Sequence, residues 1–300
     1  YVWVVVPRTT AVYKTTGLEK TTFTDADYTS IEKDLKDYTS TYVTRSGCSD
    51  TYVADDKNIG WFADATAYNN LKNSMLKSVY ENGGFYVGRY EAGIDTTTGK
   101  NRTSNTDKNS EGKYITPSTA PVTKADAYPY TYVTRTQAQN LASNVNSGTK
   151  TSSLMFGVQW DLVLAFMHNK GNIEDSTLTS NSKTIGNYSD NLWTIKNAKA
   201  QYSSNSGSTF NACPNPFKKE SYSNILLTTG ADSSFSVQNI YDIAGNVSEW
   251  TLEKTSYTSY PCAYRAGAFN NPGSNPPADY RSLSSTDDSN YDVGFRVSLF

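Results

Sequence analysis

One short stretch near the C-terminus limits the fold of this chain more than any other. Residues 239–251 read Asn-Ile-Tyr-Asp-Ile-Ala-Gly-Asn-Val-Ser-Glu-Trp-Thr, and we call them the hub. Gly245 and Asn246 tolerate a positive φ at low cost, and Asp242 favours a turn. Apolar residues that can enter a core stand directly beside these turn residues: Ile240, Ile243, Val247 and Trp250. Turn residues placed so closely between core residues predict a buried, irregular segment rather than a regular helix.

Four other motifs stand in a fixed order around the hub. Residues 84–91 read Gly-Phe-Tyr-Val-Gly-Arg-Tyr-Glu, and residues 155–161 read Met-Phe-Gly-Val-Gln-Trp-Asp. After the hub, residues 265–269 read Arg-Ala-Gly-Ala-Phe, and residues 293–297 read Val-Gly-Phe-Arg-Val. The ordered set resembles the formylglycine-generating-enzyme/sulfatase-modifying-factor superfamily, which has a variant of the C-type-lectin fold. The resemblance implies an irregular α+β fold with long loops.

The resemblance covers residues from about Gly84 to Phe300 and has one clear departure. Where the family has an arginine followed by two glycines, this chain has Arg265, Ala266 and Gly267. A length of 300 residues allows one large core or two small ones. Because no internal repeat or linker is visible, we expect one domain over residues 1–300, with core motifs in 84–300 and an N-terminal extension, 1–83, packed on it.

Local patterns predict individual elements. Residues 1–6 form a β-branched and aromatic run typical of a strand, which we expect to continue to residue 13. Apolar residues recur at helical spacing in 25–38, behind a Thr24 cap, and in 66–80, 136–145 and 154–169. Two polar stretches, 95–118 and 172–222, predict little regular structure.

Charge and hydropathy exclude two classes of partner. The net charge is −2 and the isoelectric point is about 5.6, so the chain lacks the basic surface of a nucleic-acid-binding protein. No apolar run reaches about 18 residues, so we expect no direct membrane insertion. The chain begins at Tyr1 rather than a methionine. We therefore expect a trimmed chain whose export signal or anchor lies outside it.

The cysteines and the single histidine bear on catalysis. Oxidases of the family use two cysteines shortly before the final strand, where residues 279–293 of this chain have none. Cys262 lies elsewhere, and Cu(I) requires thiolate ligands. Iron-dependent relatives need several histidines, whereas this chain has only His168, which we expect to be a helix C-terminal residue. We therefore expect no enzymatic activity and no cofactor.

The cysteine count leaves the disulfide state open. Cys48, Cys213 and Cys262 have no metal-binding spacing. A bridge between Cys213 and Cys262 is one alternative. Because the count is odd, at least one thiol stays free or joins another chain.

The resemblance implies one further alternative, a calcium site. Some relatives bind Ca²⁺ at the hub, at positions that correspond to Asn246 and Glu249, and oxygen ligands of this kind suit Ca²⁺. In the alternative, which we favour, Asn246 caps a turn and Glu249 pairs with Arg265 or Arg296. The residues expected to be structural are Gly245, Asn246, Glu249, Trp250, Arg265 and Arg296.

The stretch from Ala263 to Asp292, the 263–292 window, corresponds to loops that share one exposed face in the family. It mixes Tyr and Phe, which supply contact area, with Asn, Ser and Asp, which supply adaptable hydrogen bonds. We expect it to bind a protein or glycan on another cell or surface, from an extracellular or phage-displayed position. The predicted contact residues are Tyr264, Phe269, Asn270, Asn271, Asn275, Asp279, Tyr280, Leu283, Asn290 and Tyr291.

A second resemblance concerns the same window. The variable proteins of diversity-generating retroelements are similar in fold and carry their hypervariable residues in the corresponding window. Diversification at the adenines of asparagine codons yields Asn, Asp, Tyr and Ser, which are frequent in residues 263–292. Two interpretations stay open at this point: a receptor-type surface diversified by a retroelement, and an adhesin of fixed specificity.

Overall fold

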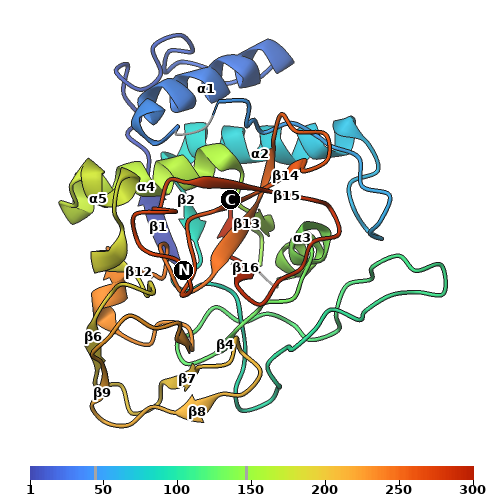
Figure 1. The fold of residues 1–300 in the computed structure, drawn as a ribbon. Coiled ribbons are helices and arrows are strands. Elements are labelled where there is room, and N and C mark those ends of the chain that lie inside the picture. Colours follow the sequence, from blue (N-terminus) through green and yellow to red (C-terminus); the bar gives the residue numbers. More distant parts are fainter. Residues whose placement is uncertain (44–45, 146–147) are drawn as a thin grey trace.

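The structure is a computed structural model that describes residues 1–43, 46–145 and 148–300. It is a mixed α+β structure with small sheets (Figure 1). Its α-helices are α1 (Asp25–Tyr38), α2 (Ala65–Asn82), α3 (Arg135–Ser143), α4 (Gly157–Gly171) and α5 (Asp175–Thr179). Single turns of 3₁₀-helix are η1 (Ser40–Tyr42), η2 (Lys183–Ile185) and η3 (Ser233–Phe235). Within the described ranges, no helix is long and apolar enough to cross a bilayer.

Two four-stranded sheets hold the main core. The first has the order β1-β2-β17-β5, all antiparallel, and brings both ends of the chain together. Its strands are β1 (Val2–Val5), β2 (Gly84–Val87), β17 (Val297–Leu299) and β5 (Ser152–Leu154). The second has the order β15-β14-β13-β16, with β16 parallel to β13. Its strands are β13 (Ser248–Lys254), β14 (Cys262–Arg265), β15 (Arg281–Ser284) and β16 (Val293–Phe295).

The other strands are short and lie in three pairs and one three-stranded sheet. The pairs are β3 (Gly93–Ile94) with β4 (Tyr128–Pro129), β6 (Trp193–Ile195) with β9 (Phe217–Lys219), and β11 (Ser236–Val237) with β12 (Ile240–Tyr241). The small sheet has the order β10 (Leu226–Leu227), β7 (Gln201–Ser203) and β8 (Asn211–Ala212).

The N-terminal extension shares its core with the motif region. Val4 pairs with Phe85 across β1 and β2. Val4 and Leu35 of the extension are fully buried, in the same hydrophobic cluster as Trp160 and Trp250. Burial of these side chains removes apolar surface from water on both sides of Gly84 at once, so residues 1–83 and 84–300 stabilise each other.

The local helix predictions are confirmed where a cap marks the boundary. Thr24 caps α1 and exchanges hydrogen bonds with Asp27 in a capping box, so the predicted range 25–38 is correct. The α2 helix ends at Gly83, which has a φ of 71°. Residues 8–13 are turns rather than a continuation of β1.

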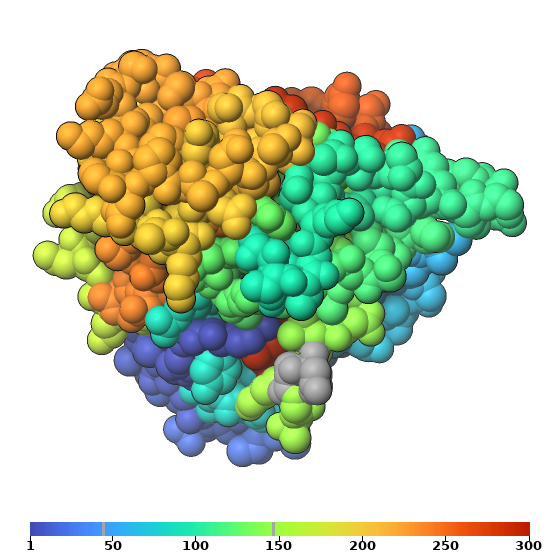
Figure 2. All heavy atoms as spheres, turned by 90° about the horizontal axis from the view of Figure 1, so that it is seen from below, coloured from blue at the N-terminus to red at the C-terminus, as the bar shows by residue number. Residues whose placement is uncertain are grey.

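Two predictions about longer segments, 154–169 and 172–222, need correction. Leu154 belongs to β5, where it pairs with Val297, and the helix begins only at Gly157. An edge strand of three residues has too short a pattern to be separated from the apolar helix that follows. The polar stretch 172–222 contains α5, η2 and β6 to β9 and contributes to a second cluster around Trp193, Ile195 and Phe235. Residues 95–118, in contrast, form no helix or strand, and they project from the body in Figure 2.

The hub is irregular and buried, as predicted. Asp242, Gly245 and Asn246 have φ values of 55°, 74° and 56°. A Cβ atom on Gly245 would lie 2.6 Å from the carbonyl oxygen of Asn187, so only glycine fits there. Trp250 is 1% exposed, and its indole Nε1 donates to the carbonyl oxygen of Val133 at 2.9 Å. The hub therefore contains three residues in the left-handed conformation and leads directly into strand β13.

Candidate ligand-binding face

Two buried arginines support the 263–292 window from below. Arg265 Nη2 contacts Asp161 Oδ1 at 2.6 Å, and its Nη1 contacts Glu253 Oε2 at 3.1 Å. Arg281 Nη2 contacts Asp161 Oδ2 at 2.6 Å, and its Nε contacts Glu253 Oε1 at 2.7 Å. Each carboxylate thus binds both guanidinium groups. Because Arg265 ends β14 and Arg281 begins β15, this arginine–carboxylate cluster joins both ends of the loop between them.

Arg281 ties the cluster to the N-terminal extension. Its Nη1 donates to the carbonyl oxygen of Tyr42 at 2.9 Å. Burial opposes ionisation of Glu253, but Arg281 and Arg265 outweigh it and lower the pKa of Glu253 to about 2. The Glu253 carboxylate is therefore charged at neutral pH and keeps its ion pairs with both arginines.

Of the two pairings predicted as alternatives for Glu249, with Arg265 or with Arg296, the structure contains the one with Arg296. Arg296 Nη2 contacts Glu249 Oε1 at 2.6 Å, and its Nε donates to both carboxylate oxygens. Arg265 instead contacts Asp161 and Glu253, as described above. Directly opposed residues do not always pair, since Glu249 faces Arg265 in the β13–β14 register and still contacts Arg296.

Asn246 connects the hub to the window. Its side-chain Oδ1 accepts from Asn187 Nδ2 and Leu227 N, both at 3.0 Å. Its Nδ2 donates to the carbonyl oxygen of Leu227 and to the Glu91 carboxylate. Its backbone oxygen accepts from Phe269 N at 3.0 Å. The side chain of Asn246 therefore binds three other segments of the chain, and its backbone oxygen binds a fourth.

These contacts also bear on the calcium alternative at Asn246 and Glu249. Both oxygens of Glu249 are bound to Arg296, and Asn246 Oδ1 already accepts two hydrogen bonds. In the described ranges, no three His, Cys, Asp or Glu side chains are grouped as metal ligands. The interactions present are those of the second alternative, an amide at a turn and a carboxylate paired with arginine.

Four polar and aromatic residues of the window lie together with one residue from outside it. Asn270 Nδ2 donates to Asp292 Oδ2 at 2.9 Å and to the Tyr291 hydroxyl at 3.3 Å. The backbone N–H of Tyr132, which lies outside the window, donates to the carbonyl oxygen of Asn290 at 3.0 Å. Asn290 is exposed and the others are half-buried. We call this set the tyrosine face: Tyr132, Tyr264, Asn270, Asn290 and Tyr291.

The Asp292 carboxylate lies near three residues of the tyrosine face, Asn270, Tyr132 and Tyr264. Burial raises the pKa of Tyr132 and of Tyr264, and the nearby Asp292 carboxylate raises both further. Tyr264 also packs edge-on against the Trp250 ring, with centroids 5.4 Å apart. The phenols therefore stay protonated at neutral pH and can donate as well as accept hydrogen bonds.

Three predicted contact residues do not belong to this face. Phe269 is 1% exposed and packs beneath Tyr291, with ring centroids 6.1 Å apart. Asp279 is fully buried, which raises its pKa to about 7. The β14–β15 register places Leu283 opposite Ala263, on the side of Arg265 and Arg281, whereas Tyr264 lies on the other side. Burial and register, which composition does not reveal, exclude these three.

The remaining predicted residues occupy the neighbouring loop. Asn271 accepts from the backbone N–H of Ala268 through its side chain, and its carbonyl oxygen accepts from Ser189 N at 2.8 Å. Asn275 is exposed, and Tyr280 is half-buried just before β15. Asn271 is thus held against the segment that includes Ser189, apart from the contacts that define the tyrosine face.

Sequence reasoning missed residues that complete the site. Tyr132 lies far upstream in the chain and has a φ of 54°, which is rare for a tyrosine. Arg281, Asp161 and Glu253 were not singled out either. The alternating pattern Arg-Ser-Leu-Ser of residues 281–284 carried a signal, because a charged residue in a predicted strand facing a buried layer needs a partner.

Cys213 and Cys262 are buried as free thiols, and His168 makes local contacts at the end of a helix. No disulfide joins Cys213 and Cys262, which lie in different hydrophobic clusters. Burial raises the pKa of both thiols to about 11. His168 lies in the last turn of α4, and its Nδ1 is 2.8 Å from the carbonyl oxygen of Ile173 and 3.3 Å from Asp175 Oδ1.

Comparisons with known proteins give only distant likenesses, all to solved structures. No family model matches the chain, and no curated protein matches it. The structure is similar to Treponema denticola variable protein 1, at 20% identity and a TM-score of 0.25, over 50% of this chain. That match covers 48% of the other chain, so this chain spans about half its length. A structure of CarF is similar at 14% identity and a TM-score of 0.28, over 90% of this chain and 82% of that one. Scores of this size do not establish a shared fold.

Proposed function

We propose that this chain is a non-enzymatic ligand-binding protein of C-type-lectin-like fold that binds a protein or glycan through the tyrosine face. The observation that carries this proposal is the tyrosine face itself, in which Asn270 contacts Tyr291 and Asp292, Tyr132 contacts Asn290, and Asp292 lies near Tyr132 and Tyr264. The order of the five sequence motifs supports the fold. An extracellular or phage-displayed location is part of the proposal, since such a face serves contact with another surface.

The supporting layer makes the face suitable for binding. The Phe269 N–H is held by Asn246, and both ends of the 266–280 loop are held by the arginine–carboxylate cluster. Loops that are ordered before binding lose less conformational entropy when a ligand binds. Tyrosine adds contact area with few rotatable bonds, and the amides of Asn270 and Asn290 offer both donors and acceptors.

The alternatives differ in how the face is specified. In one, a retroelement diversifies the window; in the other, an adhesin has one fixed partner. Asn270, Asn290 and Tyr291 belong to the residue types that diversification at adenines produces. Sequencing of the gene neighbourhood separates the two. A reverse transcriptase gene beside a copy of the 3′ end that differs at adenines supports diversification, and its absence supports fixed specificity.

A catalytic relative of the formylglycine-generating enzymes is the third alternative. Incubation with a sulfatase-type cysteine peptide, copper and oxygen tests it directly. We expect no turnover. Turnover that is lost in Cys262→Ser would replace the binding proposal with an oxidase.

The binding test uses a glycan array and a displayed protein library with the whole chain as bait. A double variant, Asn290→Ala with Tyr291→Ala, removes two side chains of the face, and a melting curve checks that it stays folded, since Tyr291 packs on Phe269. The matched control removes two tyrosines on the β13–β14 loop, Tyr257 and Tyr260, which are 57% and 53% exposed. Ligands recovered by the wild type should lose binding to the double variant and keep it to the control. The reverse result would place the binding surface elsewhere.

A further inference from the structure

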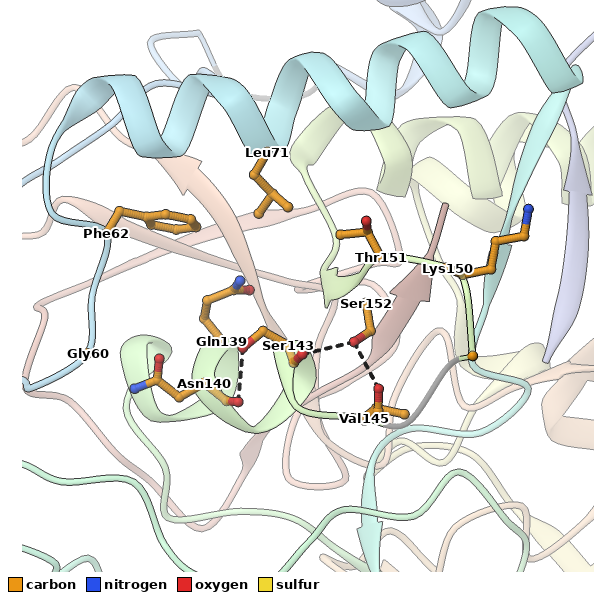
Figure 3. A pocket seen from close by; sticks show the side chains of 11 residues that line it. Gly60, Phe62, Leu71, Gln139, Asn140, Ser143, Val145, Lys150, Thr151 and Ser152 are labelled. Carbon is orange, nitrogen blue, oxygen red and sulfur yellow. Dashed lines mark hydrogen bonds between the residues drawn. The ribbon is translucent and has the colours of Figure 1, made fainter.

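A second concave site lies on the first sheet, away from the tyrosine face. A hollow of about 470 Å³ opens between α2, α3 and the edge strand β5 (Figure 3). None of its lining residues belongs to the tyrosine face or to the 263–292 window. Pockets that bind small organic molecules have volumes of about 300–1,000 Å³, so this hollow has a suitable size.

The apolar wall of the hollow comes from two elements. Phe62 and Leu71 are half-buried and face the hollow from the loop before α2 and from α2 itself. The loop is held against α3 because Asn140 Nδ2 donates to the carbonyl oxygen of Ile59 at 3.1 Å. Gly60, with a φ of 89°, permits this approach, since a Cβ atom there would lie 2.6 Å from Asn140 Nδ2. The position of the loop that carries Phe62 is therefore set by its contact with α3.

One oriented donor stands at the polar side of the hollow. Gln139 is only 6% exposed, and its Oε1 accepts from Leu154 N at 3.0 Å and Ser153 Oγ at 3.2 Å. These two bonds fix the orientation of the amide. Nε2 then donates to no acceptor in the described part of the chain, while Gln139 lines the hollow and extends from α3 toward Leu71 (Figure 3).

Two of the neighbouring hydroxyl groups, those of Ser143 and Ser152, already donate to the protein. Ser152 Oγ is 3.1 Å from the carbonyl oxygen of Ser143 and 3.2 Å from that of Val145. Ser143 Oγ donates to the carbonyl oxygen of Asn140 at 3.1 Å. The described lining residues include no carboxylate and no arginine, and the side chain of Lys150 points away from Leu71 and Gln139 (Figure 3). An uncharged ligand that presents an acceptor oxygen is therefore the best match to this surface, because an apolar group that covered Gln139 Nε2 would leave this donor without an acceptor.

We propose that the hollow binds a neutral small molecule whose carbonyl oxygen accepts from Gln139 Nε2 and whose apolar body packs against Phe62 and Leu71. This site is independent of the tyrosine face. The ligand is recognised by one hydrogen bond from Gln139 and by apolar contact with Phe62 and Leu71. The contribution of each to the affinity can therefore be tested on its own.

The probe is 4-phenylbutan-2-one, which has one carbonyl and an apolar phenyl group, and butylbenzene is the matched compound without oxygen. Binding is followed by NMR through the side-chain amide signal of Gln139, assigned by its loss in Gln139→Glu. We expect a saturable shift with the ketone and about fivefold weaker binding of butylbenzene, as one net hydrogen bond implies. Equal affinity for the two compounds, or a ketone that leaves the Gln139 signal unchanged, would overturn the proposal.

Two variants separate the site from general apolar binding. Leu71→Trp fills the hollow and should abolish binding of both compounds, whereas Leu192→Trp, at a residue 52% exposed elsewhere, should leave binding intact. Gln139→Glu keeps an oxygen for Leu154 N and replaces the donor, so it should lose the preference for the ketone. Ketone binding to Leu71→Trp at wild-type strength, or an unchanged preference in Gln139→Glu, contradicts the proposal. Melting curves confirm that each variant is folded.

Discussion

The backbone N–H of Phe269 donates to the carbonyl oxygen of Asn246 at 3.0 Å. Through this bond, the loop that carries Asn270 is attached to the same residue whose side chain holds Asn187, Leu227 and Glu91. The stability of the hub and the shape of the tyrosine face are therefore linked. A change at Asn246 should affect both.

Asn246→Ala tests this link. The variant leaves Leu227 N without its acceptor and the Glu91 carboxylate without its donor, and both groups are buried. Unsatisfied buried groups cost about 1–3 kcal/mol each, so we expect a loss of about 3 kcal/mol or more in the free energy of unfolding. Urea unfolding measures it, with Asn169→Ala near the end of α4 as the control. A loss no larger than in the control would mean that the hub amide is dispensable.

Trp250 and Gly245 should be the most sensitive apolar and backbone positions of the hub. Trp250→Ala removes a ring that is 1% exposed together with its bond to Val133, and truncations of this kind cost about 3–5 kcal/mol. Gly245→Val should be comparably harmful, since φ is 74° and Asn187 occupies the space for a Cβ. Thermal melting reports both. Unchanged midpoints would show that the core lies elsewhere.

The arginine–carboxylate cluster should depend on every member. Glu253→Gln leaves Arg265 and Arg281 with a single shared carboxylate, Asp161, in a buried site. Loss of one partner from a buried ion pair costs about 3–5 kcal/mol. The control is Asp37→Asn, which breaks an exposed pair with Lys33 on α1 that is worth about 0–1 kcal/mol. Similar unfolding free energies for the two variants would contradict a structural role of the cluster.

Stability should fall as pH rises from about 4 to about 7. Burial raises the pKa of Asp242 to about 7 and that of Asp50 to about 6, from a usual value of 3.8. The folded protein therefore holds these protons more firmly than the unfolded chain. Their contribution is complete below the unfolded pKa and is lost as pH rises through the folded pKa.

Asp242→Asn isolates one of these groups. Asn keeps an acceptor for Gly230 N, to which Asp242 Oδ2 now binds at 2.7 Å, but it does not titrate. The drop in unfolding free energy between pH 5 and pH 7.5 should shrink by at least about 1 kcal/mol in the variant. An identical pH dependence in both proteins would show that Asp242 is ionised across this range. Glu253, whose pKa is lowered from 4.5 to about 2, acts in the opposite sense: its contribution is complete above pH 4.5 and is lost only as pH falls toward 2.

The sequence by itself determined the features that depend on neighbouring residues. The Thr24–Asp27 capping box defines the start of α1, and Gly83 defines the end of α2, because each supplies a specific local hydrogen bond or dihedral angle. The positive φ values at Asp242, Gly245 and Asn246 follow from residue type in the same way. The burial of Trp250 could be predicted as well, since large apolar residues flank these turns.

Only the tertiary structure decided which distant groups meet. Arg265 contacts Asp161 across 104 residues of sequence, although Glu249 lies directly opposite it in the sheet. Register placed Leu283 on the opposite side from Tyr264, and burial removed Phe269 from the contact set. Tyr132 joined the face through a strained backbone and a bond to Asn290. Such pairings depend on the packing of whole elements, and residue type alone carries no information about which of several compatible partners lies within reach.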